Sequence, residues 1–266
     1  MRGKKIFLIL VLVFLAGCSG LETSEEKKMR MDNLVVRPIQ RESNETLFSW
    51  VPASSKQKAP YPWERKWIGD HLRITKHFFR CRGHPSNPPI QILRGKECIY
   101  HLDCGGVETH SLPIKEGKEH ICPILIDILN HLQETLGKQV IITCGHRCPT
   151  HHLYCDVSKE GQTSKHLIGA EVDFYVKGLE RTPEAVLEAL FSYYPEPMLR
   201  TLLTSASTPS WYNQEVVITL FRSTEGRDFD NDHPYPYISI QVRYDRETHR
   251  VVRYNWHQAY NGYIKY

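Results

Sequence analysis

The sequence lacks a large net charge, and its basic residues follow no pattern. Its 34 Lys and Arg residues only slightly outnumber its 30 Asp and Glu residues, which gives a formal net charge of +4. The basic residues are scattered and form no basic helix or stripe. Nucleic-acid binding therefore has no support in the sequence. A long hydrophobic run is missing as well, because the apolar run at residues 6–15 is too short for a comfortable transmembrane span.

The sequence also lacks internal repeats and the regular alternation of strand and helix that builds parallel sheets. Apolar residues at helical spacing predict a helix at residues 121–136, with Pro123 in its first turn and Gly137 as its stop. Thr182 and Pro183 are typical of a helix start and predict a second helix at 182–192. Strands are predicted at residues 77–82, 98–102, 138–143, from 169 onward, 216–221, 237–244 and 251–256, with a hairpin at 245–249 joining the last two. The predicted class is α+β, with a mainly antiparallel sheet flanked by helices.

A secretory signal is predicted at residues 1–18. Two lysines precede the apolar run, and a lipobox-like Ala-Gly-Cys ending closes at Cys18. An ordinary cleaved signal or a short anchor is the alternative. Acyl chains on Cys18 would hold the mature chain on a membrane, so we expect a bacterial lipoprotein of the cell envelope that faces the periplasm. Ser19 is not the aspartate associated with inner-membrane retention, which favours the outer membrane.

The rest of the chain divides by composition. Residues 19–46 are polar and charged and predict a flexible tether. Residues 47–76 are rich in Trp and Pro and predict an irregular arm packed on the domain, with an aromatic surface for glycan strands as the alternative. Residues 77–266 suffice for one domain with a proper core, which we expect to be a monomer.

Seven cysteines remain besides Cys18. Behind a secretory signal they are expected to form disulfides, although seven cannot all pair within one chain and the connectivity stays open. A dense cluster of soft ligands offers a structural metal site as the alternative, although its spacing matches no known zinc module. That cluster consists of Cys144, His146, Cys148, His151, His152 and Cys155.

A motif of four residues stands out from the rest of the chain. Ser164, His166, Gly169 and Asp173 form S-x-H-x-x-G-x-x-x-D, which separates an imidazole and a carboxylate by seven positions. Apolar and polar residues alternate from Gly169 onward, so this stretch predicts a strand. His166 is then expected in the turn that enters the strand, folded back over Asp173, where both side chains can reach one zinc ion.

These residues resemble the zinc D-alanyl-D-alanine peptidases, which trim the peptide stems of bacterial cell wall. The resemblance rests on the helix and strand at residues 122–143, on the Gly145, His146, Arg147 turn, which is similar to the family's Ser-Gly-Tyr-Arg, and on the motif above. It covers roughly a fifth of the chain. It implies a zinc metallopeptidase, a carboxypeptidase-like hydrolase whose substrate is a peptidoglycan peptide. It also implies that Cys144 and Cys148, which flank the turn, are joined by a local crosslink.

The resemblance assigns roles to single residues. His166 and Asp173 would be zinc ligands, Arg147 would meet the developing oxyanion, and Ser164 would receive the terminal carboxylate of the substrate. The third ligand is expected at His233, with Asp230 as the general base, because Asp230 and His233 form Asp-x-x-His. His257 is the alternative third ligand, although Tyr254 stands where the acid should be. Each of these residues also has a structural alternative. His166 could be a core histidine, Arg147 a surface residue in an ion pair, and Ser164 a simple cap.

The sequence departs from the family at two places. Ser239 and Gln241 occupy strand positions where the family's His-x-Asp form carries a ligand and an acid. Glu171 replaces a small residue of the family and lies two positions before Asp173, on the same face of the predicted strand. It could be a metal ligand or a base, or it could equally be a solvated or ion-paired side chain. These departures support a second hypothesis, a catalytically inactive relative that binds cell wall or has a structural role in the envelope.

Overall fold

The computed structural model describes residues 24–25, 65–106, 108, 110–156, 163–200 and 208–266. The predicted signal, the lipidation at Cys18, nearly all of the tether and most of the Trp-rich and Pro-rich arm lie outside the described residues. The chain divides into two units, Met1–Lys58 and Ala59–Tyr266, and every element below belongs to the second. No helix within these described ranges is both long and apolar enough to cross a membrane.

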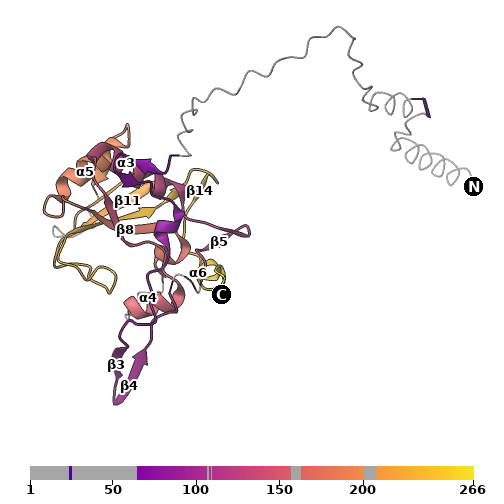
Figure 1. Cartoon of the computed structure of the whole chain (residues 1–266), viewed down its shortest axis with the longest axis vertical. Helices are drawn as coiled ribbons and strands as arrows, with labels where there is room; N and C mark the ends of the chain where they lie inside the picture. The colour runs from indigo at the N-terminus through magenta and orange to yellow at the C-terminus, as the bar shows by residue number, and fades with distance from the viewer. Residues whose placement is uncertain (1–23, 26–64, 107, 109, 157–162, 201–207) are drawn as a thin grey trace, which may run out of the picture. The chain divides into compact units, whose positions relative to one another are not determined.

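The second unit is built on a six-stranded antiparallel sheet (Figure 1). Its strands, in spatial order, are β7 (Val140–Cys144), β8 (Glu171–Val176), β12 (Tyr237–Val242), β11 (Val216–Phe221), β10 (Ser210–Tyr212) and β9 (Leu199–Arg200). Every neighbouring pair runs antiparallel. With helices packed beside this sheet, the structure confirms the α+β class.

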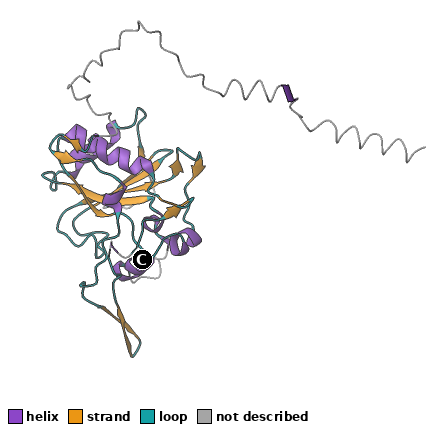
Figure 2. Cartoon of the chain, turned by 45° about the vertical axis from the view of Figure 1, so that its right-hand side comes forward, coloured by secondary structure: helices purple, strands orange, loops and turns teal. Residues whose placement is uncertain are grey.

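One face of the sheet is apolar and lies under two helices. On β11, Val216, Ile218 and Leu220 are buried, and the residues between them are half-exposed, as period-two alternation requires. Helix α3 (Pro123–Leu136) and helix α5 (Pro183–Ser192) pack together and cover this face (Figure 2). Helix α3 starts at Pro123 and is capped after Leu136 by Gly137, whose φ of 60° is the left-handed conformation that glycine adopts without strain. Both helices confirm their predictions.

The opposite face of the sheet carries polar side chains at its centre. Asp173 on β8 is the pairing partner of Ser239 on β12, and Glu171 is the partner of Gln241. Because residues two apart share a face, these four side chains lie on the side away from α3 and α5. All but Gln241 are nevertheless buried, because loops cover this face.

Smaller elements surround the sheet. The hairpin of β3 (Ile90–Arg94) and β4 (Glu97–His101) projects from the body of the domain (Figures 1 and 2). The other elements are β1 (Trp67–Ile68), β2 (His71–Leu72), η2 (Lys76–Phe79), β5 (Ile114–Lys115), β6 (Lys118–Glu119), α4 (Pro149–Cys155), η5 (Lys165–Ile168), β13 (Tyr244–Asp245), β14 (Arg250–Val251) and α6 (Trp256–Asn261).

Two predicted strands are wrong. The first part of residues 77–82 belongs instead to the 3-10 turn η2. The carbonyl of Phe79 accepts a hydrogen bond from the amide of His146 at 2.6 Å. The aromatic residues of this segment favour a strand, but strand propensity mainly reflects how side chains pack on a sheet. Here the backbone bonds to a turn and pairs with no strand in the described part of the chain, so the propensity does not decide the structure. Only Val251 of the strand predicted at 251–256 is in β14, because Asn255 caps α6 by accepting a hydrogen bond from the amide of Gln258. The predicted hairpin at 245–249 is confirmed by the pairing of β13 with β14.

Asn130 fastens the segment before η2 to helix α3. Its Oδ1 accepts from the amide of Ile74 and its Nδ2 donates to the carbonyl of Ile74, both at 2.9 Å, and the residue is buried. We expect Asn130→Leu to lower the free energy of unfolding by about 2–4 kcal/mol, because it leaves two buried backbone groups unpaired. Urea unfolding followed by circular dichroism measures this. Glu134→Leu, at an exposed position of the same helix, is the control and should change stability by less than about 0.5 kcal/mol. Equal effects of the two variants would contradict this role.

Candidate metal centre

A tight turn places His166 over strand β8. Ser164 caps η5, its Oγ accepting a hydrogen bond from the amide of His166 at 3.2 Å. Gly169 then reverses the chain with a φ of 69° and leads it into β8. A Cβ at this glycine would lie 3.0 Å from the carbonyl oxygen of His120, so space and conformation both favour glycine. The turn therefore brings the predicted pair, His166 and Asp173, together.

The two ring nitrogens of His166 have different neighbours. Nδ1 donates to the carbonyl oxygen of Gly145 at 2.7 Å. Nε2 lies 3.4 Å from Oδ2 of Asp173 and 3.8 Å from Oε1 of Glu171. A hydrogen bond that fixes the proton on one nitrogen leaves the other nitrogen as the ligand atom, which is how metal-binding histidines are held. The free ligand atom thus points at two carboxylates.

His166, Glu171 and Asp173 are ionisable residues that lie buried together, all at most 8% exposed. Burial by itself would lower the pKa of His166, but the carboxylates of Glu171 and Asp173 outweigh burial and raise that pKa to about 9. Burial would likewise raise the pKa of Asp173, but the imidazole of His166 holds it below its usual range. The arrangement therefore favours a positive charge at this position.

Glu171 is held from three sides. Its carboxylate accepts hydrogen bonds from Nε2 of Gln241 at 2.7 Å, from Oγ of Ser239 at 3.2 Å and from Oγ of Ser164 at 3.3 Å. Ser239 and Gln241 of β12 therefore anchor a carboxylate of β8. Ser164, the expected substrate-binding residue, lies beside the same carboxylate.

Cys144 adds a sulfur atom to the centre. Cys144, His166 and Asp173 each offer a ligand atom, and these atoms lie within 4.8 Å of one another. The sulfur is 3.3 Å from Nδ1 of His166, the nitrogen that faces the Gly145 carbonyl. Burial raises the pKa of the Cys144 thiol well above its ordinary value, which favours a neutral thiol. Buried Cys, His and Asp side chains thus meet here within metal-binding distance.

The expected disulfides are not formed. All seven cysteines in the described part of the chain are free thiols. The crosslink expected between Cys144 and Cys148 is missing because the two sulfurs belong to different clusters. Cys144 faces His166, whereas Cys148 caps α4 and joins Cys81, Cys104 and His110.

Arg147 lies at the centre of a buried ion network. Its Nε donates to Asp230 at 2.7 Å and its terminal nitrogen donates to Asp228 at 2.6 Å. Both ring nitrogens of His151 also face carboxylates, Asp103 at 2.6 Å and Asp230 at 3.0 Å. Although burial opposes it, His151 and Arg147 hold the pKa of Asp230 well below its usual range. Asp230, the expected general base, is therefore a carboxylate already paired with two cations.

Neither late histidine joins the pair of His166 and Asp173 in any metal-binding group of the described residues. The ring of His233 packs against Tyr175, with ring centroids 5.3 Å apart. His257 is exposed on α6. From the loop that carries His233 it is Asn231 that reaches the centre, donating to Oδ2 of Asp173 at 2.9 Å.

Sequence reasoning missed Asn231 and Asp228. The run of acidic and amide side chains at residues 228–232 was a signal for such a loop, but nothing in it indicated which side chain would turn inward. Asn231 is fully buried, and its Oδ1 accepts from Oγ1 of Thr143 at 2.6 Å, so it bridges β7 and β8.

The centre opens into a cavity of about 350 Å³. Residues on its wall include Arg147, Ser164, His166, Glu171, Asp173 and Asp228. A hollow of about 680 Å³ beside Asp245 is larger, but none of its lining residues belongs to a metal-binding group of the described chain. Chemistry rather than size therefore locates the candidate site.

Comparisons with known proteins do not identify the chain. Family models, curated proteins and solved structures were each compared with it, and none matches. The resemblance to the peptidases stays a prediction that rests on the residue motifs.

The ion network of Arg147 gives a prediction about stability. We expect Arg147→Gln to lower the free energy of unfolding by about 3 kcal/mol or more, because it removes one partner of a buried ion pair. Arg246→Gln is the matched control, since Arg246 pairs with Glu215 at the surface and its loss should cost less than about 1 kcal/mol. Chemical unfolding of both variants tests this. A cost for Arg147→Gln no greater than the control's would show that the network does not support the fold.

Proposed function

We propose that the chain is a zinc-dependent peptidase of the bacterial envelope, anchored through Cys18, that hydrolyses peptidoglycan stem peptides as a D-alanyl-D-alanine carboxypeptidase does. The observation that supports it most directly is the orientation of His166, whose Nε2 points at Asp173 and Glu171. Zinc binds imidazole nitrogen and carboxylate oxygen at about 2.0–2.2 Å, so two such atoms on a tetrahedral ion lie about 3.4 Å apart. Nε2 of His166 and Oδ2 of Asp173 are 3.4 Å apart.

The donor set also fits the chemistry of zinc. An imidazole with carboxylates suits zinc and other transition metals better than calcium or magnesium, which prefer oxygen ligands alone. His166 and Asp173 would hold the ion. Glu171, whose Oε1 lies 3.8 Å from Nε2 of His166, would be the third ligand in place of His233 or His257. An ion bound by three protein ligands supplies an activated water and polarises a carbonyl group.

The other residues of the cavity suit a peptide with a free carboxylate. Arg147 presents a buried guanidinium, which stabilises negative charge on a carbonyl or carboxylate oxygen more effectively than lysine does. Ser164 stands at the same wall, and its hydroxyl, which donates to Glu171 in this structure, would turn to the terminal carboxylate of a bound peptide. Asp228 and Asp230 orient the guanidinium. This role suits Asp230 better than that of a general base, because its depressed pKa makes it a weak proton acceptor.

A second candidate function is supported by β12. Ser239 and Gln241 stand opposite Asp173 and Glu171, where the peptidase family carries a ligand and an acid. In this alternative the three hydrogen bonds to Glu171 hold a binding site without a metal. The chain would then attach to wall peptides without cleaving them.

Muropeptide digestion decides between the two functions. We expect the full chain with zinc to shorten stem peptides by a terminal residue, detected as a fall in mass, and a chelator to stop the reaction. His166→Ala should lower the rate at least about 100-fold, because it removes a ligand from the ion. His257→Ala is the control, since His257 is exposed on α6, and it should keep the wild-type rate.

The remaining outcomes are equally informative. A drop of about tenfold or more in Glu171→Gln, with peptide binding retained, supports Glu171 as the third ligand. Unchanged peptide masses with zinc, together with binding of the chain to isolated cell wall, would reject the peptidase and favour the binding protein.

A further inference from the structure

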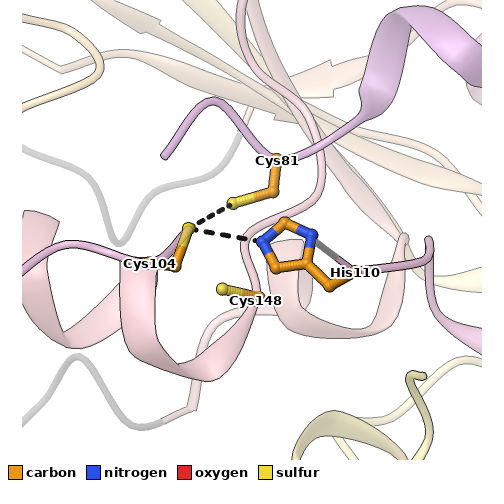
Figure 3. Close-up of side chains that lie close together, drawn as sticks. All are labelled: Cys81, Cys104, His110 and Cys148. Carbon is orange, nitrogen blue, oxygen red and sulfur yellow. Dashed lines mark hydrogen bonds between the residues drawn. The ribbon is translucent and has the colours of Figure 1, made fainter. Parts of the chain in front are cut away.

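Three cysteines and one histidine meet in a second place, away from the candidate metal centre (Figure 3). Cys81, Cys104, His110 and Cys148 each offer a ligand atom, and the four atoms lie within 4.8 Å of one another. The sulfurs of Cys81 and Cys104 are 3.9 Å apart, and Nε2 of His110 is 3.3 Å from the sulfur of Cys104. All four residues are at most 7% exposed. In Figure 3 the three sulfurs and the imidazole face one another.

We propose that these four residues bind a structural zinc ion, in a site whose existence does not depend on the proposed function. Zinc binds thiolate sulfur at about 2.3 Å and imidazole nitrogen at about 2.0–2.1 Å in a tetrahedron. Two sulfurs on such an ion lie about 3.8 Å apart, and a sulfur and a nitrogen about 3.6 Å apart. The observed separations of 3.9 and 3.3 Å are close to both values.

The number and burial of the donors indicate a structural role. Catalytic zinc sites keep one position open for water, whereas structural sites use four protein ligands. Here the four donors are all protein side chains and all buried. A disulfide between Cys81 and Cys104 would need a sulfur separation of about 2.05 Å, and it would leave Cys148 and His110 unpaired.

A backbone amide supports charged sulfur at one of the cysteines. The amide of His151 donates to the sulfur of Cys148 at 3.4 Å. Hydrogen bonds from the surroundings orient metal ligands and stabilise their charge. The backbone of Gly83 also lies close to the sulfur of Cys104. A Cβ at this glycine would be only 2.0 Å from that sulfur.

The site lies where the fold has little apolar core. Among the described residues between Cys81 and Cys104, only Gly83 is buried. The local core consists of Cys81, Cys104 and Cys148, with Tyr263 packed against them. Segments that bury too little apolar surface are commonly held by a metal ion, whose binding energy then contributes to folding.

The ion would join segments that are distant in the sequence. Cys81 follows η2, Cys104 follows the β3–β4 hairpin, and Cys148 caps the start of α4. His110 forms a β-bridge with Lys265 near the end of the chain. Arg147 precedes Cys148 in the chain, and Asp103 precedes Cys104. Both Arg147 and Asp103 belong to the ion network of the candidate centre. The site therefore fastens that network to the rest of the domain.

Metal content and cobalt substitution of the full chain test the proposal. We expect bound zinc in the wild type, and we expect cobalt in its place to give the strong sulfur-to-metal charge-transfer absorption of a thiolate site. Cys104→Ser should lose that absorption and about one metal ion per chain. Cys98→Ser is the matched control, because Cys98 is exposed on β4, and it should keep both.

A second variant covers the case in which Cys104→Ser does not fold. His110→Cys should still bind the ion, now through four sulfurs, with its cobalt charge-transfer absorption increased. His166→Ala separates the two sites, because it should leave the thiolate absorption unchanged whether or not the candidate centre binds metal. Metal content that is the same in Cys104→Ser and the wild type would overturn the proposal. So would a wild-type chain without metal in which Cys81 and Cys104 form a disulfide.

Discussion

Two buried carboxylates that face one imidazole nitrogen set the main constraint on this structure. Glu171 and Asp173 lie on the polar face of β8, and Nε2 of His166 is directed at both. Removing such charges from water costs several kcal/mol per ion unless a charge of opposite sign compensates them. The compensation comes from a proton on His166 or from a metal ion. With Nδ1 already donating to Gly145, a cation at Nε2 satisfies all three groups.

The polar face explains why so much of the chain is irregular. The apolar face of the sheet needs only α3 and α5 to cover it, and both follow simple helical patterns. The other face bears charged and hydrogen-bonding groups, so loops cover it and each loop must supply partners. Asn231 pairs with Asp173, Asp228 and Asp230 pair with Arg147, and His151 extends the network to Asp103. The cysteine cluster adjoins this network at two points, because Asp103 precedes Cys104 and Arg147 precedes Cys148 in the chain.

Sequence patterns predicted the elements whose signals are local. The helix at 121–136 had helical spacing, an early proline and a terminal glycine, and α3 matches it within two residues. The strand at 216–221 coincides with β11. His166 and Asp173 were also found locally, because a short turn and the following strand bring them together.

Features set by distant contacts could not be predicted in this way. Residues 77–82 pair with the turn at Gly145, which no pattern in the segment itself reveals. The four ligands of the cysteine cluster come from separate segments, and their spacing resembles no compact zinc module. The sequence therefore favoured disulfides and placed a possible metal site among residues 144–155, of which only Cys148 belongs to the cluster. Asn231 was missed because the inward turn of its loop depends on Thr143 and Asp173.

The central claim is that the imidazole and the two carboxylates share a metal ion. Anomalous diffraction at the zinc absorption edge, from crystals of the zinc-loaded chain, measures this directly. Our account predicts an anomalous peak within bonding distance of Nε2 of His166 and of carboxylate oxygens of Asp173 and Glu171. A well-ordered centre without such a peak, in crystals grown with zinc, would contradict it.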